Sequence, residues 1–425
     1  MRTCFEHRRC GLRMVYLVRA ALLLILGLAE GCYGADGQAA APGRPPSAAL
    51  LQTGLGDVLT SKPATPEGAG QAGTGRIRLY WDYHGRVESK RLPVEEARRP
   101  DLEGVIVAIP WAEIEPRHGT FDFSALDTEI EWWAARSRKV VIRNGVLGTV
   151  TTGAHTPPWV YDEGVPAIEF QAKPRDEKKV KLPRVWDSPR FMVLYEEYVT
   201  ALAKRYDGDP RVSFVWIGVG HLGFTVADAS KGGMTALPRA GWTPEKWTAY
   251  IEKVIDLYAG HFNKTPTLLG TGPIWTRRER GNAIVPQMRH LAVYAASKGT
   301  SLLLKGLDPD PKVYASTPFS EMLDALGQTP LPKGFTLFMG DDWPLWVDER
   351  RRAQNRHEAN RDEAGFRAAL STALSEWDRL GRKCDFVLVL LAPEMQATTP
   401  GVPEYRPEVA AILKEFMAQG AREKR

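Results

Sequence analysis

The sequence contains few residues of the kinds that build disulfide frameworks or metal centres. It has four cysteines and eight histidines in 425 residues, and two of the cysteines, Cys4 and Cys10, precede the first apolar stretch. The histidines form neither an H-x-H nor an H-E-x-x-H spacing, and no G-x-S-x-G nucleophile elbow occurs. We therefore expect no disulfide framework, no metal site and no cofactor, and we expect Cys384 to be a small buried side chain.

The chain also lacks a strong excess of either charge. Lys and Arg total 56, Asp and Glu total 51, and the formal net charge is +5. Residues 1–31 hold five Arg and two Glu, so the remainder carries a formal charge of +2. Acids and prolines interrupt the basic run at residues 173–184, which indicates a solvated loop. No basic cluster is interleaved with aromatic residues, so we expect no nucleic-acid partner.

A hydrophobic run long enough to span a bilayer is missing near the N-terminus. The apolar stretch at residues 20–29 follows five arginines and has the length of a signal-peptide core. We predict a signal peptide over residues 1–31 and export to the periplasm, the cell surface or the medium. Two alternatives remain for its end: ordinary cleavage after a small residue, or a lipid anchor on Cys32 as the only membrane attachment. Residues 32–75 are rich in Ala, Gly and Pro and are predicted to be a disordered linker.

Residues 76–425 contain eight apolar runs separated mostly by helical patterns. Near-continuous apolar runs are typical of parallel strands that are covered on both faces. No Gly-rich phosphate turn follows the first run, which disfavours a dinucleotide-binding sheet. We therefore predict an α/β fold, a single (β/α)8 TIM barrel, with strands at residues 76–83, 104–111, 139–144, 212–220, 267–272, 301–306, 335–340 and 385–391.

Four local patterns predict helix ends. Ser188-Pro189 and Thr243-Pro244 are typical N-cap and N1 pairs. Ser124 is predicted as an N-cap, with Asp127 completing a box-like arrangement. Gly381 suits the position just past a helix C-terminus.

One long motif carries a family resemblance. Residues 111–127 follow the apolar run 104–110 and read W-x-x-x-E-P-x-x-G-x-F-D-F-x-x-L-D. This string resembles the second βα unit of clan A glycoside hydrolases, especially the family 42 β-galactosidase type. Residues 156–159 and 188–212 are similar to later parts of the same family. The resemblance implies a (β/α)8 barrel that cleaves glycosidic bonds with two carboxyl groups at the C-terminal ends of its strands.

The resemblance also implies a Glu acid after the fourth strand and a Glu nucleophile after the seventh, and the chain departs from both. Gly223-Phe224 stands where related barrels often have Gly-Glu, and Asp341-Asp342 follow the seventh strand. We take Asp341 and Asp342 as candidate nucleophile or base, with turn capping as the alternative. Further candidate catalytic groups are His221, Glu394 and Glu113.

Aromatic residues give separate support for a carbohydrate site. Seven of the thirteen tryptophans fall at or beyond predicted C-terminal strand ends, where flat rings suit the C–H face of a sugar. The predicted substrate contacts are Trp81, Trp111, Arg143, Asn144, Trp159, Trp275 and Trp343. We expect Glu115 to pair with Arg143, Trp216 to lie in the core, and Trp132, Trp133, Trp247 and Trp377 to pack helices on the barrel.

Two functions are consistent with these observations. The first is an exported glycoside hydrolase-like protein that acts on poly- or oligosaccharides through unorthodox carboxylates. The second is a catalytically inactive barrel that binds glycans at the cell surface, because phenylalanine at position 224 cannot donate a proton. A carbohydrate is the expected partner in both cases.

Overall fold

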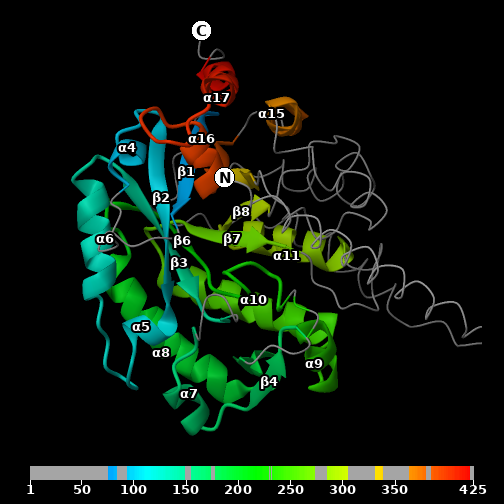
Figure 1. Cartoon of the computed structure of the whole chain (residues 1–425). Helices are drawn as coiled ribbons and strands as arrows, with labels where there is room; N and C mark the ends of the chain where they lie inside the picture. Colours follow the sequence, from blue (N-terminus) through cyan, green and yellow to red (C-terminus); the bar gives the residue numbers. More distant parts are fainter. Residues whose placement is uncertain are drawn as a thin grey trace, which may run out of the picture. The chain divides into compact units, whose positions relative to one another are not determined.

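The computed structural model describes residues 75–83, 93–148, 155–173, 178–228, 230, 232–272, 285–304, 331–337, 363–379 and 384–421, all within the compact unit formed by residues 56–425. Eight parallel strands close into a barrel (Figure 1). The predicted (β/α)8 fold is confirmed. In chain order the barrel strands are β1 (Ile77–Tyr83), β2 (Leu102–Pro110), β3 (Lys139–Gly145), β6 (Val212–Trp216), β7 (Thr267–Thr271), β8 (Ser301–Leu304), β9 (Lys333–Leu337) and β10 (Phe386–Leu390).

In the described residues, helices follow most of these strands and cover the barrel from outside, as α6, α8 and α10 do in Figure 1. Among the described residues, no helix is long and apolar enough to cross a membrane. The helical segments are α4 (Val94–Ala97), α5 (Trp111–Ile114), α6 (Ser124–Ala134), α7 (Trp159–Asp162), the 3-10 turn η1 (Val185–Asp187), α8 (Pro189–Tyr206), α9 (Gly233–Arg239), α10 (Pro244–His261), α11 (Val285–Ser297), α15 (Glu363–Arg379), α16 (Ala392–Ala397) and α17 (Pro407–Ala421).

Two of the predicted helix starts are confirmed and one is wrong. The Ser188 hydroxyl accepts from the Phe191 amide at 3.2 Å, and the Thr243 hydroxyl accepts from the Lys246 amide at 3.3 Å. Ser124 is instead the first residue of α6 and caps nothing with its side chain. Its amide donates to the Asp122 carboxylate at 2.9 Å. The predicted end at Gly381 lies outside the described residues.

A two-stranded antiparallel hairpin stands apart from the barrel sheet. It pairs β4 (Ala167–Gln171) with β5 (Lys179–Pro183). Val180 and Leu182 are buried while Lys179 and Lys181 are exposed. The prediction of a solvated loop through residues 173–184 is therefore wrong for β5, because alternate positions of that segment bury apolar side chains.

The alternation of side chains along each strand divides the core into two clusters. One fills the barrel and includes Tyr80, Phe214 and Trp216. The other lies between the barrel and its helices and holds Trp133, Trp247 and Trp377, all fully buried. Half-buried Trp132 also packs against this outer cluster. The predicted packing of Trp216 and of the helix tryptophans is confirmed, as is the burial of Cys384.

Candidate functional site

A buried ion pair lies inside the barrel near the C-terminal ends of its strands. Asp82 follows the barrel-filling Tyr80 by two residues on β1, and Arg143 follows Val141 in the same way on β3, so both point inward. The Arg143 guanidinium donates to the Asp82 carboxylate at 2.5 Å, and both residues are at most 3% exposed. The guanidinium carbon of Arg143 lies 5.2 Å from the centroid of the Trp216 ring. The predicted pairing of Arg143 with Glu115 is wrong.

The chain turns sharply after β6, at the position where the resemblance implies the catalytic acid. The Phe224 amide donates to the His221 carbonyl at 3.0 Å, and Leu222 and Gly223 have φ of 53° and 81°. Two positive φ values in succession are typical of a type I′ turn, and they are uncommon for leucine. This turn directs the side chain of Phe224 inward.

Phe224 occupies the barrel interior. Its ring meets Trp216 edge-on, with centroids 4.9 Å apart, and only 3% of the residue is exposed. Trp216 Nε1 donates to the Gly223 carbonyl at 2.9 Å, which fixes the turn over the ring. His221 is half-buried beside it and pairs through its backbone with Leu147. An apolar side chain thus fills the end of β6.

The Glu115 carboxylate organises the turn after α5. The carboxylate accepts hydrogen bonds from Trp111 Nε1 at 2.7 Å and from the Gly119 amide at 2.8 Å. The backbone carbonyl of Glu115 accepts a further hydrogen bond from Trp159 Nε1 at 2.9 Å. Burial is the largest influence on this group and raises the pKa of Glu115. A fully buried carboxylate with these partners holds the loop together.

The other candidate carboxylates lie in three different settings. Glu394 is fully buried and accepts from the Leu391 amide at 3.0 Å, so it caps the start of α16. This bond gives the Glu394 carboxylate a structural partner, and its role as an acid stays a prediction. Glu113 is exposed on α5. Asp341 and Asp342, together with Trp275 and Trp343, lie outside the described residues.

Three predicted substrate contacts face the helices instead of the mouth. Trp81 is 4% exposed and packs edge-on against Trp133 of α6, with ring centroids 5.9 Å apart. Trp111 and Asn144 are fully buried, and Asn144 Oδ1 accepts from the Tyr198 hydroxyl at 2.8 Å. On a strand, neighbours point to opposite faces, so Trp81 and Asn144 point away from Asp82 and Arg143. Arg143 points into the mouth but is buried in its ion pair.

A surface cluster around His118 gave no signal in the sequence. His118 Nδ1 lies 3.1 Å from Glu163 Oε1 and Nε2 lies 2.9 Å from Glu197 Oε2, although these partners are 45 and 79 residues away. The two carboxylates raise the pKa of His118, and Arg190 with His118 lowers that of Glu163. Half-buried Trp159, a predicted substrate contact, stacks on the imidazole at 4.5 Å.

Comparison with known proteins finds similarity to glycoside hydrolases over part of the chain. Residues 86–218 match the family 42 glycoside hydrolases, described as β-galactosidases. Over 144 residues the chain is 30% identical to β-galactosidase BgaH of Haloferax lucentense. The aligned segment covers 32% of this chain but only 20% of that enzyme. The resemblance predicted from the motif at residues 111–127 is confirmed.

Solved structures similar to this chain include a xylanase and a β-galactosidase. Xylanase 10B of Thermotoga petrophila aligns over 81% of this chain and 95% of its own, with 11% identity and a TM-score of 0.49. The β-galactosidase of Marinomonas ef1 aligns over 81% and 60%, with 12% identity and a TM-score of 0.48. The barrel itself is established by the strand pairing described above.

Proposed function

We propose that this chain is an exported glycoside hydrolase-like protein that cleaves glycosidic bonds of oligo- or polysaccharides at the C-terminal end of its barrel. The observation that carries the proposal is the match of residues 86–218 to the family 42 β-galactosidases. That segment builds β2, β3, β6 and the loops between them. In barrel enzymes these strand ends meet around the axis, where substrates bind.

Hydrolysis needs one carboxyl group to protonate the leaving oxygen and another to attack carbon or activate water. Within the described part of the chain, Asp82 is paired with Arg143 and Glu394 caps α16. We therefore assign the nucleophile or base to Asp341 or Asp342, which follow β9. Glu113 and His221 are the proposed proton donors.

A second candidate function is glycan binding without hydrolysis. The observation that favours it is the burial of Phe224 against Trp216 at the end of β6. A phenyl ring has no proton to give, so this position supplies no general acid. In this version the barrel retains a carbohydrate site and lacks the acid.

Export and surface attachment are part of the proposal. The arginine-rich leader and the apolar stretch at residues 20–29 support passage across a membrane. Cys32 is the proposed lipid attachment point if the leader is processed as a lipoprotein. Mass spectrometry of the mature N-terminus distinguishes a lipidated Cys32 from ordinary cleavage.

The test measures cleavage of aryl glycosides and oligosaccharides by the purified chain and by Asp341→Asn and Asp342→Asn. Loss of turnover by about 100-fold or more in one variant identifies its catalytic carboxylate. Asp162→Asn, at an exposed position of α7, is the matched control and is expected to retain activity. Binding without turnover supports the second function. Absence of both binding and turnover across the panel contradicts both functions.

A further inference from the structure

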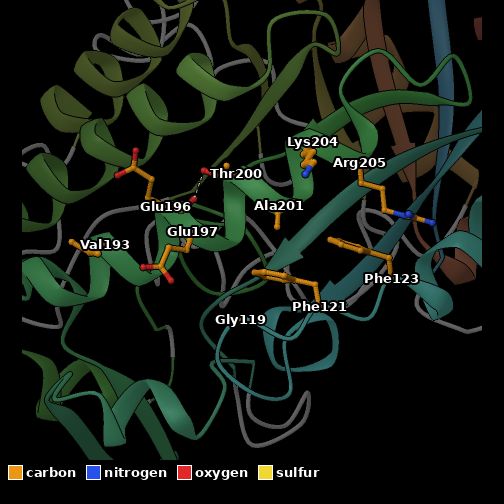
Figure 2. A pocket seen from close by; sticks show the side chains of 10 residues that line it. All are labelled: Gly119, Phe121, Phe123, Val193, Glu196, Glu197, Thr200, Ala201, Lys204 and Arg205. Atoms are coloured by element: carbon orange, nitrogen blue, oxygen red, sulfur yellow. Dashed lines mark hydrogen bonds between the residues drawn. The ribbon is translucent and has the colours of Figure 1, made fainter.

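An open groove of about 920 Å³ lies on the outer surface of the barrel, along helix α8. Figure 2 shows it between the segment at residues 119–123 and the helix. Both elements belong to the layer outside the strands, whereas Asp82 and Arg143 lie inside the barrel. The groove is therefore a separate site from the proposed active site.

One wall of the groove is an aromatic platform formed by Phe121 and Phe123. Their rings are within 13° of parallel, with centroids 6.2 Å apart, and Figure 2 shows them side by side. Phe123 makes an edge contact with Tyr206 at 5.6 Å. The Arg205 guanidinium, which also lines the groove, lies 5.4 Å from the Phe123 ring. Arg205 is fixed in turn by Asp127. The platform is thus preorganised and half-exposed.

The opposite wall is a single face of α8. Glu197, Thr200 and Lys204 recur at spacings of three and four residues, so their exposed side chains share that face. Together they present a carboxylate, a hydroxyl and an ammonium group. Glu197 is held in place by His118, and Lys204 makes no ion pair with any described residue. This wall supplies acceptors and donors opposite a flat apolar surface.

We propose that this groove binds an oligosaccharide chain as an auxiliary site. The platform fits the apolar C–H face of a pyranose ring, and the α8 side chains fit its hydroxyl groups. A protein partner fits less well, because stable interfaces have an apolar core. Although exposed Val193 also lines the groove, the α8 wall consists mainly of charged and hydroxyl side chains. The inference rests on the proposed function only for the class of ligand.

The experiment is calorimetric titration of the full chain with hexasaccharides of β-1,4-linked glucose, xylose or galactose, alongside hydrolysis of a short aryl glycoside. Phe121→Ala is expected to weaken hexasaccharide binding at the groove about tenfold, the loss of one stacking contact, with hydrolysis of the aryl glycoside unchanged. Thr200→Arg is expected to abolish groove binding by filling it.

Thr128→Arg is the matched control for the second variant. Thr128 is also exposed on a helix and donates to the carbonyl four residues earlier, at 2.9 Å, as Thr200 does at 2.7 Å, but it does not line the groove. Trp132→Ala, half-buried on α6, is the aromatic control. Both are expected to bind hexasaccharide as the wild type does.

The two proposals fail in different ways. Hexasaccharide binding that is unchanged in both Phe121→Ala and Thr200→Arg overturns the groove site, whatever the aryl glycoside assay gives. Binding that depends on Phe121 and Thr200 in a protein without hydrolysis supports the groove and contradicts only the hydrolytic function. Binding lost equally in Thr128→Arg also overturns the groove site, because the effect is then not local.

Discussion

The buried pair of Asp82 and Arg143 leads to a quantitative stability prediction. Arg143→Met removes the guanidinium and leaves the Asp82 carboxylate without its 2.5 Å partner at a residue that is 3% exposed. Removing one partner of a buried ion pair typically costs about 3–5 kcal/mol. Loss of the cation 5.2 Å from the Trp216 ring adds roughly 0.5–2 kcal/mol. We therefore expect a loss of at least about 3 kcal/mol in the free energy of unfolding.

Urea unfolding followed by tryptophan fluorescence measures this loss directly. The double variant Asp82→Leu/Arg143→Met removes both charges and is expected to recover most of it, to within about 2 kcal/mol of the wild type. A loss below about 1 kcal/mol for Arg143→Met alone refutes the reasoning. A double variant less stable than Arg143→Met does so as well, because the cost then comes from packing and not from an uncompensated charge.

Two further predictions concern the surface and the helix ends. His118 has a raised pKa in the folded chain, so its stabilising effect is complete below the unfolded value of about 6.5 and is lost as the pH rises through the folded value. The stability advantage of the wild type over His118→Gln is therefore expected to be larger at pH 5.5 than at pH 9. The change in this advantage is expected to stay below about 1 kcal/mol, because the imidazole ring is partly solvated. Thermal melts of both proteins at both pH values measure it. Ser188→Ala is expected to cost about 1 kcal/mol through loss of the cap on α8, whereas Ser124→Ala, which removes no cap, costs no more than a few tenths in the same urea assay.

Two outcomes contradict these expectations for His118 and for the serine variants. A stability gap for His118→Gln that widens towards alkaline pH has the wrong sign for a histidine held between Glu163 and Glu197. High salt is expected to narrow the gap at pH 5.5, since exposed charges are screened. Equal losses for Ser188→Ala and Ser124→Ala contradict the assignment of the cap.

The barrel was predictable because parallel strands covered on both faces are apolar throughout. Each of the eight predicted runs overlaps a strand of the barrel, although β2 and β9 begin two residues earlier than predicted and β6 ends at Trp216 and not at residue 220. The β4–β5 hairpin was not predictable in the same way. In β5, Lys179 and Lys181 alternate with buried Val180 and Leu182, and a half-charged segment between prolines has the composition of a loop.

The site was less predictable, because its contacts join residues far apart in the chain. Asp82 and Arg143 are separated by 61 positions, and a single sequence contains no signal for that pair. A period of two along a strand does constrain the choice. Once Tyr80 is taken as barrel-filling, Asp82 must point inward and Trp81 outward, so the predicted sugar contact at Trp81 conflicted with a rule that the sequence already supplied.

The motif that carries the resemblance has mainly structural contacts in this chain. Trp111 and Gly119 both donate to the Glu115 carboxylate, which explains why tryptophan, glutamate and glycine occur at those spacings. These contacts stabilise the turn whether or not the barrel hydrolyses a bond. In the proposed function, hydrolysis depends instead on Asp341 or Asp342 and on a separate proton donor. At β6 the position holds buried Phe224, so hydrolysis by this chain requires a proton donor at another position, for which Glu113 and His221 are the proposed groups. The Asp341 and Asp342 variants with the glycoside panel bear on the second carboxyl group that hydrolysis needs.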